Sequence, residues 1–170
     1  MDQGHSEVPE PFTWGPIVWK YLHCLTEKIG LSNNPIVDND QALFIENMIT
    51  SLYLVIPCPE CQSHALTYIT SNPFPSLKGL RGEMLRNIVR NWLFNFHNHV
   101  RTFKKQPLVL ATVEACKEHY KGCFVPKCEY ILFIKNVAFA VRQNWVKIDN
   151  WRKWYSNSEK LRISLGTVVI

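Results

Sequence analysis

The sequence predicts an all-α protein: a four- or five-helix bundle with a C-terminal helical extension. Apolar residues recur at the three- and four-residue spacing of helices in several long segments. Proline and glycine stand between these segments, where helices end. We find no convincing strand pair, internal repeat or low-complexity stretch. Helices packed around one core are therefore expected.

Local signals place the individual helices. Thr13 is the expected N-cap of the first helix, with Pro16 in its first turn and Gly30 ending it. Asp38 and Gln41 resemble a capping box that opens the second helix. The predicted helices cover residues 13–29, 38–56, 59–71, 82–104, 110–120 and 127–146. Residues 165–170 are apolar and β-prone and receive no assignment.

Length and composition indicate an ordinary globular protein. The 170 residues are 46% hydrophobic and 19% charged, enough to bury a core. Residues 12–122 are expected to form the bundle, and residues 123–170 a helical extension packed on it or extending it. The net charge of +5 suits an anionic cofactor or partner, and nucleic-acid binding is not expected. No run approaches the roughly 18 apolar residues of a membrane span, so no membrane association is expected.

Six cysteines indicate redox chemistry or metal binding. Residues 1–11 are acidic and polar, unlike a secretory signal or an Arg-rich transit peptide. A chain without an export signal normally keeps its thiols reduced, which argues against a secreted disulfide scaffold.

The most informative segment is the Cys58-x-x-Cys61 motif. Pro59 suits the first turn of a helix, which puts Cys58 near the N-cap and Cys61 in the first turn. The N–H groups and the dipole at a helix start stabilise a thiolate, so the pKa of a thiol there falls below about 8.5. The segment therefore predicts a redox disulfide. A thioredoxin-like strand context is absent, since helical segments flank the motif.

Three segments together suggest a flavin site beside this disulfide. A flavin needs aromatic and imidazole groups against its rings, polar groups at the edge of the isoalloxazine and cations at its pyrophosphate. Trp19, His23, His97 and Asn98 are candidates for the first two roles. Candidates for the third role are Arg81, Arg101, Lys104 and Lys105. Taken singly, these tryptophans and histidines are more often packing residues, and the cations a solvated helix face. The functional interpretation depends on the three segments occurring together in one chain.

Between about Trp14 and Tyr120 the chain resembles the Erv/ALR family of FAD-linked sulfhydryl oxidases, closest to the short forms of large cytoplasmic DNA viruses. The resemblance rests on three motifs in the family's order. They are Gly-x-x-x-Trp-x-x-x-His from Gly15 to His23, Cys-x-x-Cys-x-x-His from Cys58 to His64, and His-Asn-x-Val from His97 to Val100.

The resemblance implies a homodimeric helical bundle that holds FAD non-covalently. Cys61 would lie against the isoalloxazine, Cys58 would exchange with substrate dithiols, and His64 would pack beside the flavin. The implied cofactor-binding residues are Trp14, Gly15, Trp19, His23, His64, His97, Asn98, Val100, Arg101, Lys104 and Lys105. Arg101 departs from the family, which has asparagine there, and the family's later Gly-Lys is missing. Lys104 or Lys105 would then take that role.

The implied reaction is disulfide formation in protein substrates. A substrate thiolate attacks the Cys58–Cys61 disulfide, a second one resolves the mixed disulfide, and electrons pass through Cys61 to FAD and then to O2, giving H2O2. Partners would be protein dithiols, such as a thioredoxin-like or virion protein. The implied location is the host cytoplasm, in a viral factory or virion, or alternatively the mitochondrial intermembrane space.

The other cysteines and two rival functions stay open at this stage. Cys116, Cys123 and Cys128 are candidates for a shuttle pair or a structural bridge, with no pairing fixed by sequence. Cys24 is expected to pack as a small hydrophobe. One rival is a zinc-binding module built on the Cys-x-x-Cys, although we predict no metal site. The other is a dithiol reductase or isomerase without flavin.

Overall fold

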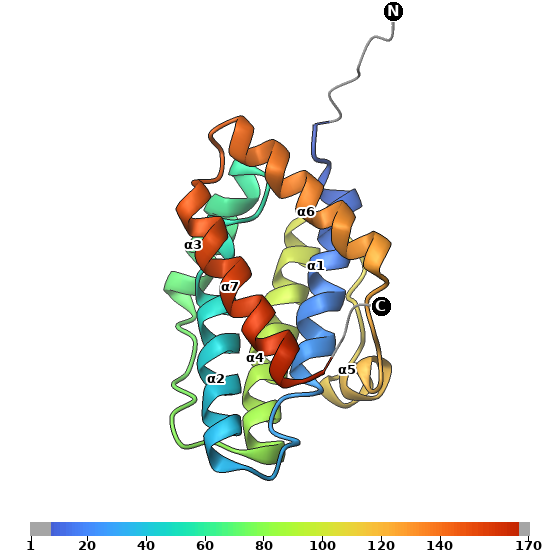
Figure 1. The fold of residues 1–170 in the computed structure, drawn as a ribbon. Coiled ribbons are helices and arrows are strands. Elements are labelled where there is room, and N and C mark those ends of the chain that lie inside the picture. Colours follow the sequence, from blue (N-terminus) through green and yellow to red (C-terminus); the bar gives the residue numbers. More distant parts are fainter. Residues whose placement is uncertain (1–7, 167–170) are drawn as a thin grey trace, which may run out of the picture.

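The computed structural model describes residues 8–166, and the all-α prediction is confirmed for this part of the chain (Figure 1). No strand is present among these residues. None of their helices combines the length and the apolar character that a membrane span requires. The helices are α1 (Pro11–Thr26), α2 (Pro35–Thr50), α3 (Pro59–Ser71), α4 (Gly82–Phe103), α5 (Val113–Tyr120), α6 (Lys127–Arg142) and α7 (Ile148–Ser164), with a 3-10 turn at Leu52–Leu54.

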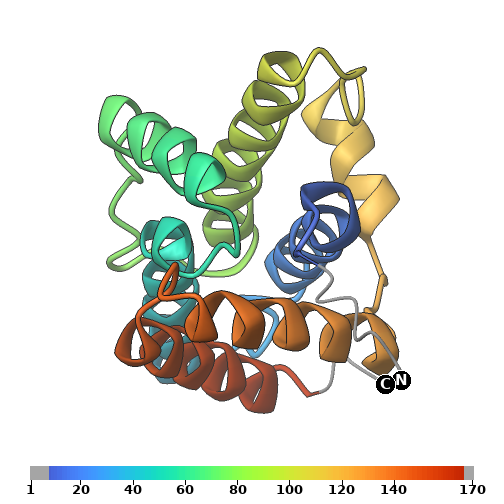
Figure 2. The same cartoon turned by 90° about the horizontal axis from the view of Figure 1, so that it is seen from above.

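Helices α1, α2 and α4 run alongside one another, and α6 and α7 lie side by side across them (Figures 1 and 2). The main packing pairs are α2 with α7, α1 with α6 and α1 with α4. Buried apolar residues of α1, α2, α3, α4, α6 and α7 belong to one core cluster. Helix α3 follows the 3-10 turn and holds the Cys-x-x-Cys near one end of the bundle.

Two predicted helix starts are wrong. Helix α1 begins at Pro11, so Thr13 lies inside it rather than at its N-cap. Helix α2 begins at Pro35, because Pro35 presets the helical φ and the Asn34 side chain caps the N–H groups of the next turn. The supposed capping residue Asp38 is buried within α2.

The two supposed capping-box residues instead hold the loop between α1 and α2. Asp38 accepts hydrogen bonds from the Ser32 hydroxyl at 2.6 Å and the Gly82 N–H at 3.4 Å. Gln41 accepts one from the Gly30 N–H at 2.9 Å. These bonds satisfy buried polar groups where α1 ends close to the start of α4.

Gly30 should tolerate no side chain. Its φ is +68°, and a Cβ there would lie 2.9 Å from the backbone nitrogen and oxygen of Gly82. Gly79, with φ +78° and no heavy atom within 4 Å, is the matched control for the backbone term alone. We expect Gly79→Ala to lower the free energy of unfolding by about 1–2 kcal/mol, and Gly30→Ala to lower it clearly further. Equal losses in urea unfolding would contradict the close approach.

The C-terminal region contains a helix that was not predicted from the sequence. The expected last helix, residues 127–146, ends already at Arg142, and α7 follows from Ile148. Its aromatic residues are packing residues: Trp154 is buried, and its Nε1 donates to the Met48 carbonyl at 3.0 Å. Of the unassigned tail, Leu165 and Gly166 follow α7, and residues 167–170 lie outside the described residues.

The pairing of the remaining cysteines also differs from expectation. Cys24 is not simply a small core residue, because it forms a disulfide with Cys123. This bond joins α1 to the segment between α5 and α6, across a sequence separation of 99 residues. Cys116 is a buried free thiol and Cys128 an exposed one. None of the three possible pairings among Cys116, Cys123 and Cys128 is present.

Candidate functional site

The Cys58–Cys61 disulfide forms at the start of α3, as predicted. Cys58 is the N-cap residue, and its Sγ accepts a hydrogen bond from the Cys61 N–H at 3.2 Å. Pro59 occupies the first helical position, where a missing N–H costs no hydrogen bond. A helix start that donates to Sγ also stabilises the thiolate that disulfide exchange produces.

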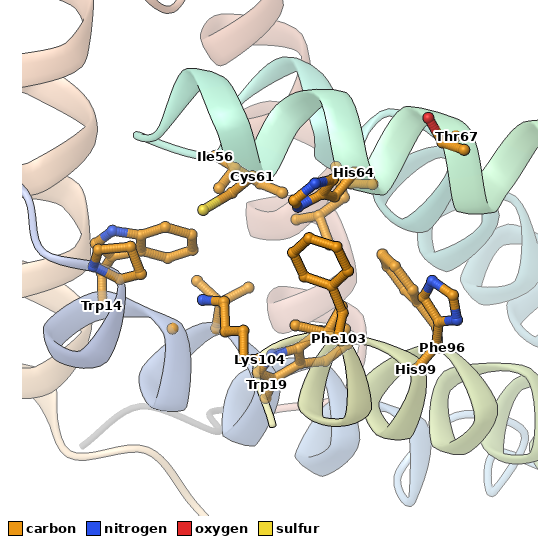
Figure 3. A pocket seen from close by; sticks show the side chains of 16 residues that line it. Trp14, Trp19, Ile56, Cys61, His64, Thr67, Phe96, His99, Phe103 and Lys104 are labelled. Carbon is orange, nitrogen blue, oxygen red and sulfur yellow. The ribbon is translucent and has the colours of Figure 1, made fainter. Parts of the chain in front are cut away.

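A cavity of about 210 Å³ lies between α3 and the facing parts of α1 and α4 (Figure 3). The Cys61 sulfur points into it from α3, whereas Cys58 is not among its lining residues. Most of the wall is aromatic, imidazole or aliphatic. The lining residues are Pro11, Trp14, Gly15, Val18, Trp19, Leu52, Ile56, Cys61, His64, Ala65, Thr67, Phe96, His99, Val100, Phe103 and Lys104.

Two observations indicate that a ligand belongs in this cavity. Among the described residues, Trp14 Nε1 is the only buried side-chain nitrogen or oxygen without a hydrogen-bond partner. Such groups are uncommon because an unpaired buried N–H loses its bonds to water. At Gly15 an added Cβ would meet no heavy atom within 4 Å, so the wall there faces open space. A flat ligand would fill the open space beside Gly15.

A second hollow of about 530 Å³ adjoins the first and is more polar. Trp19, Val100 and Lys104 line both, so the two form one continuous site. Arg101 and Lys104 supply positive charge in the second hollow. Arg101 is positioned by its Nε, which donates to the Pro107 carbonyl at 2.8 Å. The continuous site therefore has an apolar end at Cys61 and a cationic end at the last turn of α4.

A buried pair of imidazoles supports the wall between α1 and α4. His23 Nε2 and His97 Nδ1 share a hydrogen bond of 3.2 Å. The His97 ring stacks on Trp19 and the His23 ring on Tyr120, with centroids 4.2 and 4.4 Å apart. Burial lowers the pKa of His23 to about 3 and that of His97 to about 2, so both are neutral near pH 7.

The neighbouring thiol of Cys116 is a poor candidate for redox exchange. Its Sγ lies 3.7 Å from His23 Nδ1 in the interior. Burial raises the pKa of this thiol to about 11, so the nucleophilic thiolate is scarce at neutral pH.

The imidazole pair should make stability depend on pH. Unfolded histidines bind protons below about pH 6.5, whereas His23 and His97 stay neutral in the fold. Stability should therefore fall as pH drops from about 6.5 towards 4, by about 1.4 kcal/mol per pH unit for each extra proton that the unfolded chain binds. His97→Gln should make this slope shallower in urea unfolding at several pH values. An unchanged slope would show that His97 does not stay neutral.

The structure brings most predicted site residues together. Those on the two hollows are Trp14, Gly15, Trp19, Cys61, His64, His97, Val100, Arg101 and Lys104. Three predicted cofactor residues line neither hollow. His23 shares a hydrogen bond with His97, and the Asn98 side chain accepts a hydrogen bond from the Val109 N–H at 3.1 Å. Lys105 is exposed at the turn after α4. Arg81 lies at the opposite end of α4, as its N-cap.

Several wall residues were not anticipated from sequence. Phe96, His99 and Phe103 follow one another at steps of three and four along α4, so they share a face near Val100. That spacing was a usable signal. Phe103 is 54% exposed, and its ring lies 3.9 Å from that of His64, which joins α4 to α3 at the cavity. Tyr120 reaches the second hollow from α5.

Comparison with known protein families identifies the family to which this bundle belongs. The model of the Erv1 / Alr family matches residues 16–121. The chain belongs to the Erv1 / Alr family. The match runs from α1 to the end of α5 and includes both site cysteines. Helices α6 and α7 lie beyond the part of the chain that this family model matches.

Curated viral proteins are similar to between half and two thirds of the chain. One, from Invertebrate iridescent virus 3, is named "Putative FAD-linked sulfhydryl oxidase 096R" and is 30% identical over 102 residues, covering 60% of this chain and 63% of that protein. The FAD-linked sulfhydryl oxidase of African swine fever virus is 33% identical over 89 residues in a Kenyan pig isolate and 35% over 91 in a Namibian warthog isolate. Each of these two matches covers 51% of this chain and 64% of the relative.

The chain thus spans just under two thirds of the length of the curated relatives that it matches. No solved structure matches it.

Proposed function

We propose that the chain is an FAD-linked sulfhydryl oxidase that forms disulfides in protein dithiols. The observation that carries the proposal is the position of Cys61. It belongs to a disulfide at a helix start and lines an aromatic cavity whose Trp14 N–H has no partner. The Erv1 / Alr family match and the names of the viral relatives support the same activity.

The residues present suit FAD. The apolar cavity offers aromatic and imidazole walls for the isoalloxazine. Arg101 and Lys104 suit the pyrophosphate, and the second hollow beside His97 suits the adenosine. His23 and Asn98 would act by positioning His97 and the Pro107–Val109 segment. Bound FAD would accept the electron pair from the dithiol and pass it to oxygen, so that R(SH)2 and O2 give R(S–S) and H2O2.

The chain's own cysteines would perform the exchange. A substrate thiolate attacks Cys58 Sγ, the Cys58–Cys61 bond breaks, and Cys61 leaves as a thiolate. The second substrate thiol, after losing its proton, attacks the substrate sulfur of the mixed disulfide, which releases oxidised substrate and the Cys58 thiolate. The Cys61 N–H, 3.2 Å from Cys58 Sγ, stabilises the negative charge on Cys58. Cys61 is placed to return the electrons because it faces the cavity.

Purified protein should be yellow, release FAD on denaturation and consume oxygen with dithiothreitol, forming one H2O2 per disulfide. The zinc-binding module predicts colourless protein that releases zinc. The structure gives that rival little support, because Cys123 is bonded to Cys24. Within residues 8–166 no three residues of the types His, Cys, Asp or Glu are grouped as a metal site. A flavoprotein that exchanges disulfides without oxygen uptake would instead support the reductase or isomerase.

Three further features belong to the same proposal. The chain acts as a homodimer on protein dithiols, with O2 as the acceptor. The viral origin of the relatives supports action in the cytoplasm of an infected host cell rather than in mitochondria. Light scattering that gives a monomer mass would overturn the homodimer. Fractionation that finds the protein only in mitochondria would overturn the location in the host cytoplasm.

A further inference from the structure

We propose that a groove on the other side of α3 binds the polypeptide segment that carries the substrate dithiol. This inference rests on the proposed oxidase function and adds the place where the substrate segment binds and the residues that it favours beside the dithiol. The groove has a volume of about 300 Å³. It is formed by the 3-10 turn, α3 and the turn between α6 and α7. Its lining residues are Tyr53, Leu54, Gln62, Ser63, Leu66, Trp145, Lys147 and Asn150.

Helix geometry places this groove beside the exchanging sulfur. Cys61, His64 and Ala65 lie on the side of α3 that faces the cofactor cavity. Gln62 and Leu66 lie one and two turns beyond Cys58 and belong to the groove side. Cys58, as N-cap, stands at the boundary between the two sides. Cys58 is half-buried and lines neither the cavity nor the groove, but Gln62, one turn further along α3, lines the groove. We infer that a peptide in the groove brings its thiolate to Cys58 while Cys61 faces the cavity.

The far wall of the groove comes from this chain's C-terminal helices. Gln62 Nε2 donates to the Ile56 carbonyl at 2.8 Å and to the Trp145 carbonyl at 2.9 Å. One side chain thus fixes the α6–α7 turn against the loop before the Cys-x-x-Cys. Trp145, Lys147 and Asn150 lie beyond residues 16–121, the part that the family model matches. One wall of the groove therefore lies outside the matched family region, whereas the 3-10 turn and α3 belong to that region.

The chemistry of the lining defines the occupant. Leu54, Tyr53 and Trp145 give apolar surface, and Leu66 is 45% exposed beside them. Lys147 is the only charged residue among those that line the groove. Asp149, in the first turn of α7, is paired with Arg152 at 3.6 Å. The complementary partner is an extended segment with a large apolar residue and an acidic residue next to its cysteine.

Dithiol peptides test the groove. Two peptides share a Cys-x-x-Cys and a flanking leucine, and differ only in a flanking glutamate or lysine. Oxygen uptake gives kcat/KM for each, with dithiothreitol as a substrate too small to use the groove. Wild-type protein should prefer the glutamate peptide by about threefold to fivefold. Lys147→Glu should reverse that preference while dithiothreitol turnover stays unchanged. Lys153→Glu, which carries the same charge change on a different surface of α7, should keep the wild-type preference.

A second variant tests the apolar surface of the groove. Leu66→Ser should lower kcat/KM by about tenfold for the leucine peptides and leave dithiothreitol turnover intact. The groove proposal is overturned if Lys147→Glu leaves the preference between the two peptides as in wild type and Leu66→Ser leaves kcat/KM for both peptides as in wild type. A wild-type protein that fails to oxidise dithiothreitol overturns the oxidase itself, and the groove proposal with it.

Discussion

Cys58→Ser and Cys61→Ser are each expected to abolish oxygen uptake with dithiothreitol, by at least about a thousandfold. Each variant lacks the disulfide that must be attacked and reformed in every turnover. Flavin absorbance should remain, because the other residues of the two hollows are unchanged. The measurement is oxygen consumption per bound flavin.

Matched variants sharpen this prediction. Cys128→Ser removes an exposed free thiol outside the site and should stay within about twofold of wild type. The two site variants should also differ from each other. Cys61→Ser leaves Cys58 as the accessible thiol, so it should form a mixed disulfide with glutathione disulfide faster than Cys58→Ser does. Full turnover in either site variant, or faster trapping at Cys61, would refute the assigned roles.

Loss of the Cys24–Cys123 disulfide is expected to cost roughly 4–5 kcal/mol of unfolding free energy. In the chain-entropy model the cost grows with the length of the closed loop, and here the two cysteines are 99 residues apart. Cys123→Ala removes the bond with little loss of buried packing, since Cys123 is only half-buried, and is the cleaner variant. Urea unfolding with oxidised protein provides the measurement.

A variant that lacks both cysteines distinguishes the loss of the covalent bond from the loss of packing by the two side chains. Each single variant already breaks the bond, so Cys24→Ala with Cys123→Ala should lose little more than the larger single loss. Cys128→Ala, which breaks no bond, should unfold like wild type. Single losses below about 1 kcal/mol, or losses that add fully, would show that the bond does not stabilise the fold.

The helical class and the core of the site could be predicted from sequence because their signals are local. Pro59 after Cys58 fixes the start of α3, and the apolar spacing from Leu85 to Val100 fixes the face of α4 that meets α1. The two wrong helix starts have different causes: Pro11 and Pro35 start α1 and α2 earlier than expected, and Asp38 was mistaken for a cap. Asp38 resembles a capping residue in sequence, yet it binds the Gly82 N–H, 44 residues away.

The long-range features could not be read from sequence. The pairing of Cys24 with Cys123 depends on how α1 packs against the segment before α6, and several pairings fit the same spacing. Lys104 lines both hollows and Lys105 lines neither, which depends on where α4 ends: the helix stops at Phe103, and Lys105 follows with φ +53°. The bridge from Gln62 to Trp145 joins residues 83 positions apart, which no local pattern reveals.

The most direct test is a crystal structure of the yellow protein with its flavin. It should show the isoalloxazine in the cavity between Trp14, His64 and Phe103, in van der Waals contact with Cys61 Sγ, and the phosphates near Arg101 and Lys104. A flavin bound elsewhere, or a Cys58–Cys61 disulfide turned away from the ring, would contradict the account.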